Sequence, residues 1–144
     1  MDSGPPKSYE DWENEVPKEI KEDTLWSYVA YPKALFLFDL AWFDCERLMK
    51  DARGRALIEQ LITAAGSISA NIEEGYSKGF GADYARFLKI ALGSSRETRG
   101  WYWRVRRLLP TEVIKHRMAL AKEIISLLLT TIRQQRPPKN SKSK

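Results

Sequence analysis

A helical repeat of apolar and small residues over 82–109 limits the fold of this chain more than any other part of its sequence. Positions that face one side recur after four and then three residues, which is the pattern of a helix packed in a bundle. These positions are Tyr84, Leu88, Ala91, Ser95, Thr98, Tyr102, Val105 and Leu109. The spacing predicts a helix over 82–109, roughly 40 Å long, that stops at Pro110.

Three further segments have a helical period, and no alternating strand pattern occurs. The segments are 32–52, 55–74 and a last one from Thr111 or Glu112 to Gln135. In the first, Ala34–Phe43 is apolar nearly all round, so its second side is expected to meet another subunit. Gly75 is expected to end the second, and Thr111 to cap the last. The inward positions of the last are Val113, Leu120, Ile124, Leu127 and Thr131 or Ile132. Four such helices predict an all-α fold, an antiparallel up-and-down four-helix bundle.

Charge is divided unevenly along the chain. Residues 1–24 carry eight acidic groups and three Lys, whereas the remaining 120 residues carry 21 basic and 11 acidic groups. We therefore expect an acidic flexible N-terminal arm (1–25), with a short helical piece around Val16–Asp23, a four-helix bundle (26–135) and a basic disordered tail (136–144). The opposite charges suggest that the arm folds back on the basic face and competes with nucleic acid.

Composition excludes several classes of protein. Cys45 and His116 are the only residues of their types, too few for a Cys/His zinc site. Val113 precedes His116 by three residues, so the Glu-x-x-His pattern of di-iron bundles is missing. No phosphate-binding glycine loop or nucleophile elbow occurs. We expect no catalytic residue, no metal and no cofactor. Without a spanning apolar segment or a signal peptide, a cytoplasmic protein that binds no membrane is expected.

One flank of the 82–109 helix gathers arginines around an indole. At 100° per residue these side chains fall beside one another, outside the core stripe. They are Arg96, Arg99, Trp103, Arg106 and Arg107. Guanidinium groups pair with phosphate and indoles stack on unpaired bases, so the flank predicts a nucleic-acid-binding face. The alternative is a solvated cationic helix whose Trp packs under Arg stems or in a subunit contact. Arg133 and Arg136 near the C-terminus are phosphate contacts or part of a solubilising end.

Polar and small residues lie close to this flank. A polar cluster is expected near Gly75, from Asn71, Glu74, Ser94 and Glu97. We interpret it as structural; the less favoured reading is a hydrolase that uses the two carboxylates for acid–base work. Gly93 and Gly100, seven residues apart, suggest close approach by another backbone, in an oligomer contact or in packing on the first or last helix.

Two ordered motifs carry a family resemblance. Ser67–Gly75 reads Ser-Ile-Ser-Ala-Asn-Ile-Glu-Glu-Gly, and Phe87–Glu97 reads Phe-Leu-Lys-Ile-Ala-Leu-Gly-Ser-Ser-Arg-Glu. Over about residues 26–135 the chain resembles the bacterial four-helix-bundle proteins named after reading frames in 23S ribosomal RNA intervening sequences. The resemblance implies a ring-shaped homopentamer with a basic surface and no established enzymatic activity. It also implies a fold similar to the accessory variability determinant of diversity-generating retroelements, which works beside a reverse transcriptase.

These observations favour one function and leave a second open. The first is a non-enzymatic, oligomeric bundle whose basic Arg/Trp face binds nucleic acid, either structured RNA or an RNA–DNA hybrid. The alternative is a protein-interaction or scaffold module, for example an accessory subunit to a reverse transcriptase.

Overall fold

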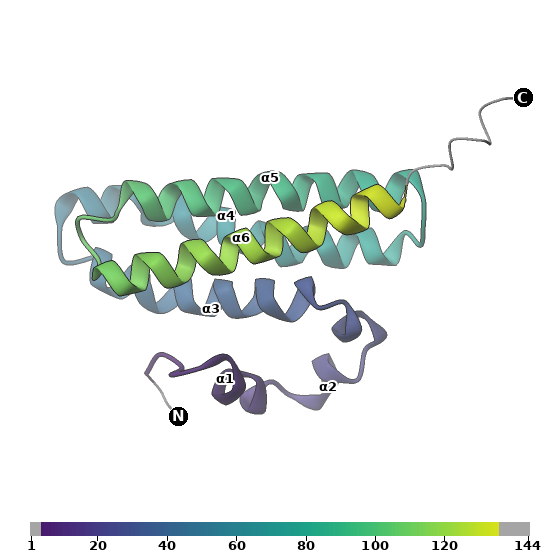
Figure 1. Cartoon of the computed structure of the whole chain (residues 1–144). Helices are drawn as coiled ribbons and strands as arrows, with labels where there is room; N and C mark the ends of the chain where they lie inside the picture. The colour runs from purple at the N-terminus through teal and green to yellow at the C-terminus, as the bar shows by residue number, and fades with distance from the viewer. Residues whose placement is uncertain (1–3, 136–144) are drawn as a thin grey trace, which may run out of the picture.

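The computed structural model describes residues 4–135, and all of the regular secondary structure in that range is helical (Figure 1). The prediction of an all-α fold is confirmed. Four long helices are α3 (Ala30–Leu48), α4 (Ala52–Ser77), α5 (Ala82–Arg104) and α6 (Thr111–Gln134). Before them come α1 (Tyr9–Glu15), α2 (Lys18–Lys21) and the 3-10 helix η1 (Thr24–Ser27). None of the helices described here is both long and apolar enough to cross a lipid bilayer.

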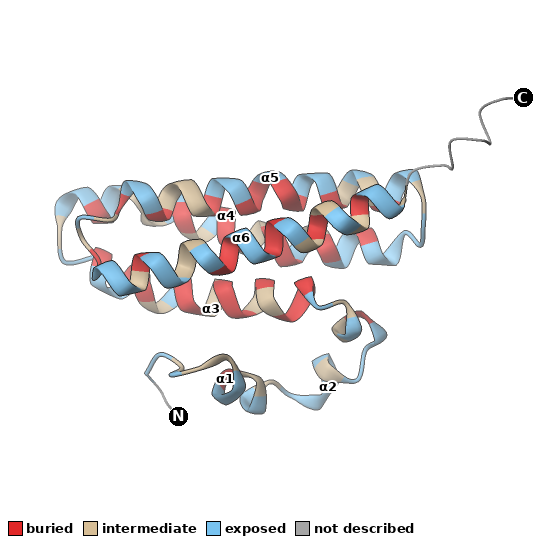
Figure 2. Cartoon of the chain, in the orientation of Figure 1, coloured by how far each residue is buried: buried red, intermediate tan, exposed pale blue. Residues whose placement is uncertain are grey.

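The four long helices lie side by side, and their facing sides hold the core (Figure 2). α4 packs on α3 and α5, and α6 packs on α5 and α3. All eight inward positions predicted within 82–109 are buried. The two hydroxyl residues in that row satisfy themselves within α5, because Ser95 Oγ donates to the carbonyl of Ala91 at 2.8 Å and Thr98 Oγ1 to that of Ser94 at 2.8 Å. The inward row of α5 therefore accepts polar residues without an unpaired hydrogen-bonding group.

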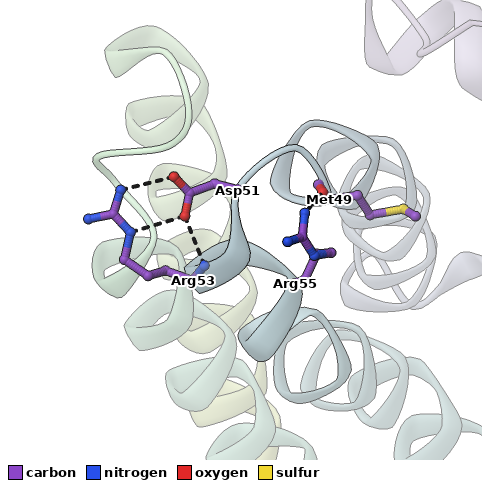
Figure 3. A network of polar contacts seen from close by, with 4 residues as sticks. All are labelled: Met49, Asp51, Arg53 and Arg55. Carbon is purple, nitrogen blue, oxygen red and sulfur yellow. Dashed lines mark hydrogen bonds and ion pairs between the residues drawn. The ribbon is translucent and has the colours of Figure 1, made fainter.

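Charged side chains hold the connection from α3 to α4 (Figure 3). The carboxylate of Asp51, which caps α4, accepts from the backbone N–H of Arg53 at 2.8 Å. It also accepts from the Arg53 guanidinium at 3.0 and 2.9 Å. These bonds hold the pKa of Asp51 well below its usual range. Arg55 Nη1 donates to the carbonyl of Met49 at 2.8 Å. Because this cap starts α4 at residue 52, the predicted helices over 32–52 and 55–74 are corrected to Ala30–Leu48 and Ala52–Ser77.

The expectation that Gly75 ends its helix is wrong. Gly75 is buried inside α4, and a Cβ added there would lie 2.9 Å from Cβ of Phe87 in α5. Glycine is needed at this position because two helix backbones approach closely, not because a helix ends. The left-handed positions come later, at Gly79 (φ 90°) and Gly81 (φ 85°), where glycine adopts a positive φ without steric cost.

The connection from α5 to α6 begins earlier than the sequence predicts. α5 ends at Arg104 instead of 109, and the next residues turn tightly: the N–H of Leu108 donates to the carbonyl of Val105 at 2.9 Å. Leu109 remains buried beyond the helix end, so the apolar repeat runs on through a turn. Pro110 occupies the N-cap position of α6, and its side chain makes no capping hydrogen bond. The assignment of Thr111 as the N-cap is therefore wrong by one residue.

Residues 4–29 fold against α3, which corrects the expectation of a flexible arm over that range. Trp12 of α1 is only 7% exposed. Its indole Nε1 donates to Asp39 Oδ2 at 2.7 Å, and its ring lies 5.3 Å from Phe36 and 6.2 Å from Trp26. The short helical piece expected around Val16–Asp23 contains α2. Buried aromatic area and one hydrogen bond to a carboxylate offset the entropy of ordering this segment.

This segment also changes the interpretation of α3. Its second apolar side was expected to meet another subunit. Around Phe36 that side is covered by α1 of the same chain, so the expectation is wrong there. Further along α3, Trp42 and Met49 remain 58% and 56% exposed.

Candidate nucleic-acid interface

Positive charge is concentrated on α5, α6 and their connection. Residues 82–135 carry eleven Lys or Arg and four Asp or Glu, a net charge of +7. Residues 4–81 carry nine Lys or Arg and fourteen Asp or Glu, a net charge of −5. The acidic segment 4–29, which contains α1 and α2, lies along α3 on the side away from α5 (Figure 1). The suggestion that the acidic arm covers the basic face is therefore wrong for residues 4–29.

Two exposed cations of α6, Lys115 and Lys122, lie toward α5, whereas Glu123 lies toward α3. Lys115 lines the same groove as Trp103 of α5. Lys122 follows it by seven residues, which places it on the same side of α6. Glu123, one position further round, pairs with Lys33 of α3 at 3.1 Å. The two helices therefore share one face of a single sign, which raises the local concentration of a polyanion.

The predicted arginines lie in two places. Arg96 is exposed and Arg99 half-buried on α5, whereas Arg106 and Arg107 lie in the turn after α5. The placement of the last two on a helical flank is thus wrong, because α5 stops at Arg104. Across residues 4–135 none of the four predicted arginines lies within 4 Å of a carboxylate. Their guanidinium groups are available to an external anion.

Trp103 and Arg106 do come together. The guanidinium carbon of Arg106 lies 3.8 Å from the centre of the Trp103 ring. Arg106 Nη1 also donates to the carbonyl of Trp103 at 2.9 Å, so the guanidinium is held on two sides. The Trp103 side chain is nonetheless 53% exposed. A guanidinium and an indole thus stack at the surface, which is close to the alternative in which the Trp packs under an Arg side chain. Trp103 still remains about half exposed.

Sequence reasoning left out three more cations of this face. They are Arg86, Lys89 and Arg104, all exposed on α5. The signal was available, because these residues repeat every three or four positions on the side opposite to the core. Together with Arg96, Arg107 and two glycines, these three cations form a row that we call the outer stripe: Arg86, Lys89, Gly93, Arg96, Gly100, Arg104 and Arg107.

The two glycines of the outer stripe contact no neighbouring helix. A Cβ at Gly93 would have no atom within 4 Å, and one at Gly100 would meet only the side chain of Arg104. The suggestion that they pack on the first or last helix is therefore wrong. Gly93 leaves open space between the cations, and the space beside Gly100 is taken by the Arg104 guanidinium. Each glycine lowers the stability of an exposed helix by about 1 kcal/mol relative to alanine.

The expected polar cluster forms only in part. Asn71 Nδ2 donates to Ser67 Oγ at 2.9 Å, and Ser94 Oγ donates to the same oxygen at 2.9 Å. Glu74 and Glu97 are exposed and lie on opposite sides of this contact, about ten helical residues or ~15 Å apart. The structure therefore does not bring together the carboxylate pair that the hydrolase reading needs.

A buried ionic network, which sequence reasoning missed, joins three helices at the same end as Trp103. Asp44 of α3 is 4% exposed and accepts from Arg117 of α6 through Nε at 2.7 Å and Nη2 at 3.0 Å. The hydroxyl of Tyr102 of α5 also donates to Asp44, at 2.7 Å. Burial and the carboxylate raise the pKa of Tyr102 well above its usual value. Burial lowers the pKa of Arg117, but the bonds to Asp44 outweigh it and raise the value.

The remaining predicted residues and the single cysteine add no further contact to the candidate interface. Arg133 is exposed in the last turn of α6, and Arg136 lies outside the described residues. Burial and the neighbouring carboxylate of Asp44 raise the pKa of Cys45 to about 11, so its thiol stays protonated. Between residues 4 and 135 no group of three His, Cys, Asp or Glu side chains is placed to hold a metal ion.

Comparison with known proteins gives one match. A family model described as 23S rRNA-intervening sequence protein matches residues 30–130, which span α3, α4, α5 and most of α6. No curated protein and no solved structure matches the chain. The matched range contains all of the outer stripe and leaves out α1, α2 and η1.

Proposed function

We propose that this chain, which belongs to the 23S rRNA-intervening sequence protein family, is a non-enzymatic protein that binds structured RNA or an RNA–DNA hybrid through α5 and α6. The observation that carries the proposal is the outer stripe, in which four cations and two glycines of α5 lie away from the core and Arg107 follows in the turn after the helix. Cations without carboxylate partners release counterions from a phosphate backbone on binding. Gly93, which has no neighbouring atom where a Cβ would be, lets that backbone approach the helix closely.

The name of the family decides which nucleic acid to test first. It names an intervening sequence of 23S ribosomal RNA, which makes a structured RNA the first choice. Double-stranded RNA is recognised mainly by shape and by phosphate and ribose contacts, for which no base-reading helix is required. The first probe is therefore an RNA hairpin, with an RNA–DNA hybrid and a DNA duplex of equal length beside it.

Matched charge variants test the proposal. The face variant replaces Arg96, Arg99 and Arg107 by Gln. The control replaces Lys7, Lys18 and Lys50 by Gln. These three lysines are exposed and lie in the acidic segment 4–29 or in the turn after α3. Both lose three charges. We expect the face variant alone to bind the hairpin more weakly in a gel shift, with a smaller dependence of log K on log salt by up to about 0.9 per lost phosphate contact.

Two results would overturn the proposal. One is the absence of any gel shift by the unaltered protein at low salt with all three probes. The other is an equal loss of affinity in both variants, because net charge alone would then explain binding. Circular dichroism of both variants checks that the helices persist.

A second candidate function is protein interaction, for which α3 supplies the specific observation. Trp42 of α3 and Met49, the residue that caps the C-terminus of α3, are seven residues apart and are more than half exposed. Large exposed apolar side chains mark contact surfaces. In this proposal the long helices form an antiparallel up-and-down four-helix bundle, and copies associate through α3 into a ring-shaped homopentamer. A reverse transcriptase is the alternative partner for the same side.

Light scattering and co-purification separate these partners. The homopentamer predicts five times the mass of one chain in light scattering, reduced by Trp42→Glu. A partner such as a reverse transcriptase would stay bound after nuclease digestion and be lost from the same variant. If the protein is a monomer in light scattering and no other protein co-purifies with it after nuclease digestion, the second candidate function is wrong. The proposal of nucleic-acid binding is not affected by that result.

A further inference from the structure

A groove lies where the last turn of α5 meets the first turns of α6. Its volume is about 410 Å³, and its lining is Trp103, Arg106, Thr111, Ile114, Lys115 and Met118. Ile114 is buried and Met118 half-buried, which gives the groove an apolar floor. Arg106 and the exposed Lys115 add two positive charges. A hollow of this size falls within the range of sites that hold small organic groups.

Comparison with other grooves shows what is special about this one. The groove beside Trp12 also has an indole, but Asp11, Glu15 and Asp39 line it and repel an anion. The groove at the opposite end of α5 has Arg86 and Lys89 but no aromatic ring. The groove at Trp103 combines an exposed ring with cations and has no carboxylate in its lining.

We infer that this groove takes one unpaired base of a nucleic acid, from a loop, a bulge or a strand end. The inference rests on the proposed function and names the part of the nucleic acid that this site recognises. Bases that are not paired stack on indole rings and on guanidinium planes, and Trp103 and Arg106 present both at one rim. The apolar side chains of Ile114 and Met118 complete the contact below the base.

The charges of the groove fit the rest of the nucleotide. Lys115 and Arg106 lie at the groove, where the phosphates on either side of a stacked base would pass, and neither has a carboxylate partner within 4 Å among residues 4–135. Arg107 follows directly and continues into the outer stripe. A hairpin bound along α5 through its phosphates would therefore bring its loop or an end to this groove.

The experiment measures affinity by fluorescence anisotropy for three probes of equal length. The first is a single-stranded oligonucleotide, the second is the same strand with abasic positions, and the third is a fully paired duplex. The proteins are the unaltered chain, Trp103→Leu, Trp103→Phe and Phe80→Leu. Phe80 is 88% exposed and lies outside the groove, so Phe80→Leu is the matched control for loss of an exposed ring.

We expect Trp103→Leu to bind the single strand about 5- to 150-fold more weakly, the range for loss of one base stacked on an aromatic side chain. Trp103→Phe should retain most of the affinity because it keeps a ring, and Phe80→Leu should not change it. The abasic strand should bind the unaltered protein as weakly as the single strand binds Trp103→Leu. The duplex should bind Trp103→Leu and the unaltered chain equally.

The outcomes separate this inference from the proposed function. If Trp103→Leu binds the single strand as tightly as the unaltered protein, or if abasic and base-bearing strands bind alike, no base enters the groove. The apolar floor of the groove would then be a candidate contact for a protein partner. The proposal that α5 binds phosphates would not be affected. If none of the three probes binds at any salt concentration, the proposed function itself fails.

Discussion

Two arginines at the same end of the bundle have opposite situations. Arg117 has a side chain that is 11% exposed, and its fork is bonded at two points to the buried carboxylate of Asp44. Arg106 lies eleven residues earlier, against the half-exposed ring of Trp103, without a carboxylate partner. The side chains are chemically identical. What each can do depends on whether a fixed anion already occupies its donors.

The difference predicts which measurement each arginine affects. A charge that is buried and paired cannot be left without its partner at low free-energy cost, so Arg117 affects folding. An exposed guanidinium contributes little to folding, but it can pair with phosphate. Changes at the two positions should therefore separate stability from nucleic-acid affinity.

Arg117→Met should have the largest effect, a loss of about 3–5 kcal/mol in the free energy of unfolding, because it leaves the Asp44 carboxylate buried without a counter-charge. Urea denaturation followed by circular dichroism measures the loss. The affinity of the remaining folded protein for the RNA hairpin should not change, since Arg117 faces the core.

The control for this prediction removes the whole network. In Asp44→Leu with Tyr102→Phe and Arg117→Met, no polar group is left without a partner, so this protein should be more stable than Arg117→Met alone. A free energy of unfolding for Arg117→Met within 1 kcal/mol of the unaltered value would contradict the structural role of this arginine.

The same two positions show how far sequence reasoning reached. Trp103 and Arg106 were predicted as neighbours and are in contact, although the helix that was to place them ends at Arg104. Arg117 was missed. Its position between the predicted inward residues Val113 and Leu120 was a usable signal, because a charge in a core row requires a partner from another helix.

Inward rows were predicted well and helix ends were not. Every inward position of the 82–109 row is buried, because a long repeat averages over local exceptions. In α6 the row is shifted by one residue in two places, where Ile114 and Leu128 are buried and Val113 and Leu127 are half-buried. Neighbouring apolar residues in α6 leave the direction of the row ambiguous, and only packing on α3 and α5 decides it.

The prediction that the acidic segment is flexible was wrong because it gave more weight to the charge of the segment than to its aromatic residues. Tyr9, Trp12 and Val16 follow a spacing of three and four residues, the pattern of a short amphipathic helix. All three pack on the core. Trp12 also needs an acceptor for its indole N–H, which Asp39 of α3 supplies, and a contact between residues so distant in sequence cannot be found from composition.

Arg106→Gln tests the other side of the comparison and should have a smaller effect. Stability should change by no more than about 0.5 kcal/mol, as for most surface substitutions. Affinity for the RNA hairpin should fall, and the dependence of log K on log salt should decrease by about one if Arg106 contacts one phosphate. Arg55→Gln, an exposed arginine bonded to the carbonyl of Met49 at the α3–α4 connection, is the matched control and should leave affinity unchanged.

If Arg106→Gln lowered the free energy of unfolding as much as Arg117→Met, the stacked pair with Trp103 would be a structural element. Arg106 and Arg117 would then both act on folding, and the comparison would no longer separate stability from nucleic-acid affinity.

The smallest effect concerns the pH dependence of the contact between Arg117 and His116. Arg117 Nη1 lies 2.8 Å from His116 Nδ1, and this nitrogen can accept only when the ring is neutral. Burial and the positive charge of Arg117 lower the pKa of His116, against an opposing contribution from Asp44. Since the folded-state pKa lies below the unfolded value of about 6.5, stability is full above that pH and is lost as pH falls below it.

His116→Gln should remove this loss, so its stability should fall less than that of the unaltered chain between about pH 6.5 and pH 5. Urea denaturation at several pH values gives the difference between the two proteins, and carboxylates that titrate at lower pH cancel in that difference. If the unaltered chain instead gained stability relative to His116→Gln as pH fell, protonated His116 would have found an anion. Asp44, the carboxylate bonded to Arg117, would be that partner, and the network would extend to the surface.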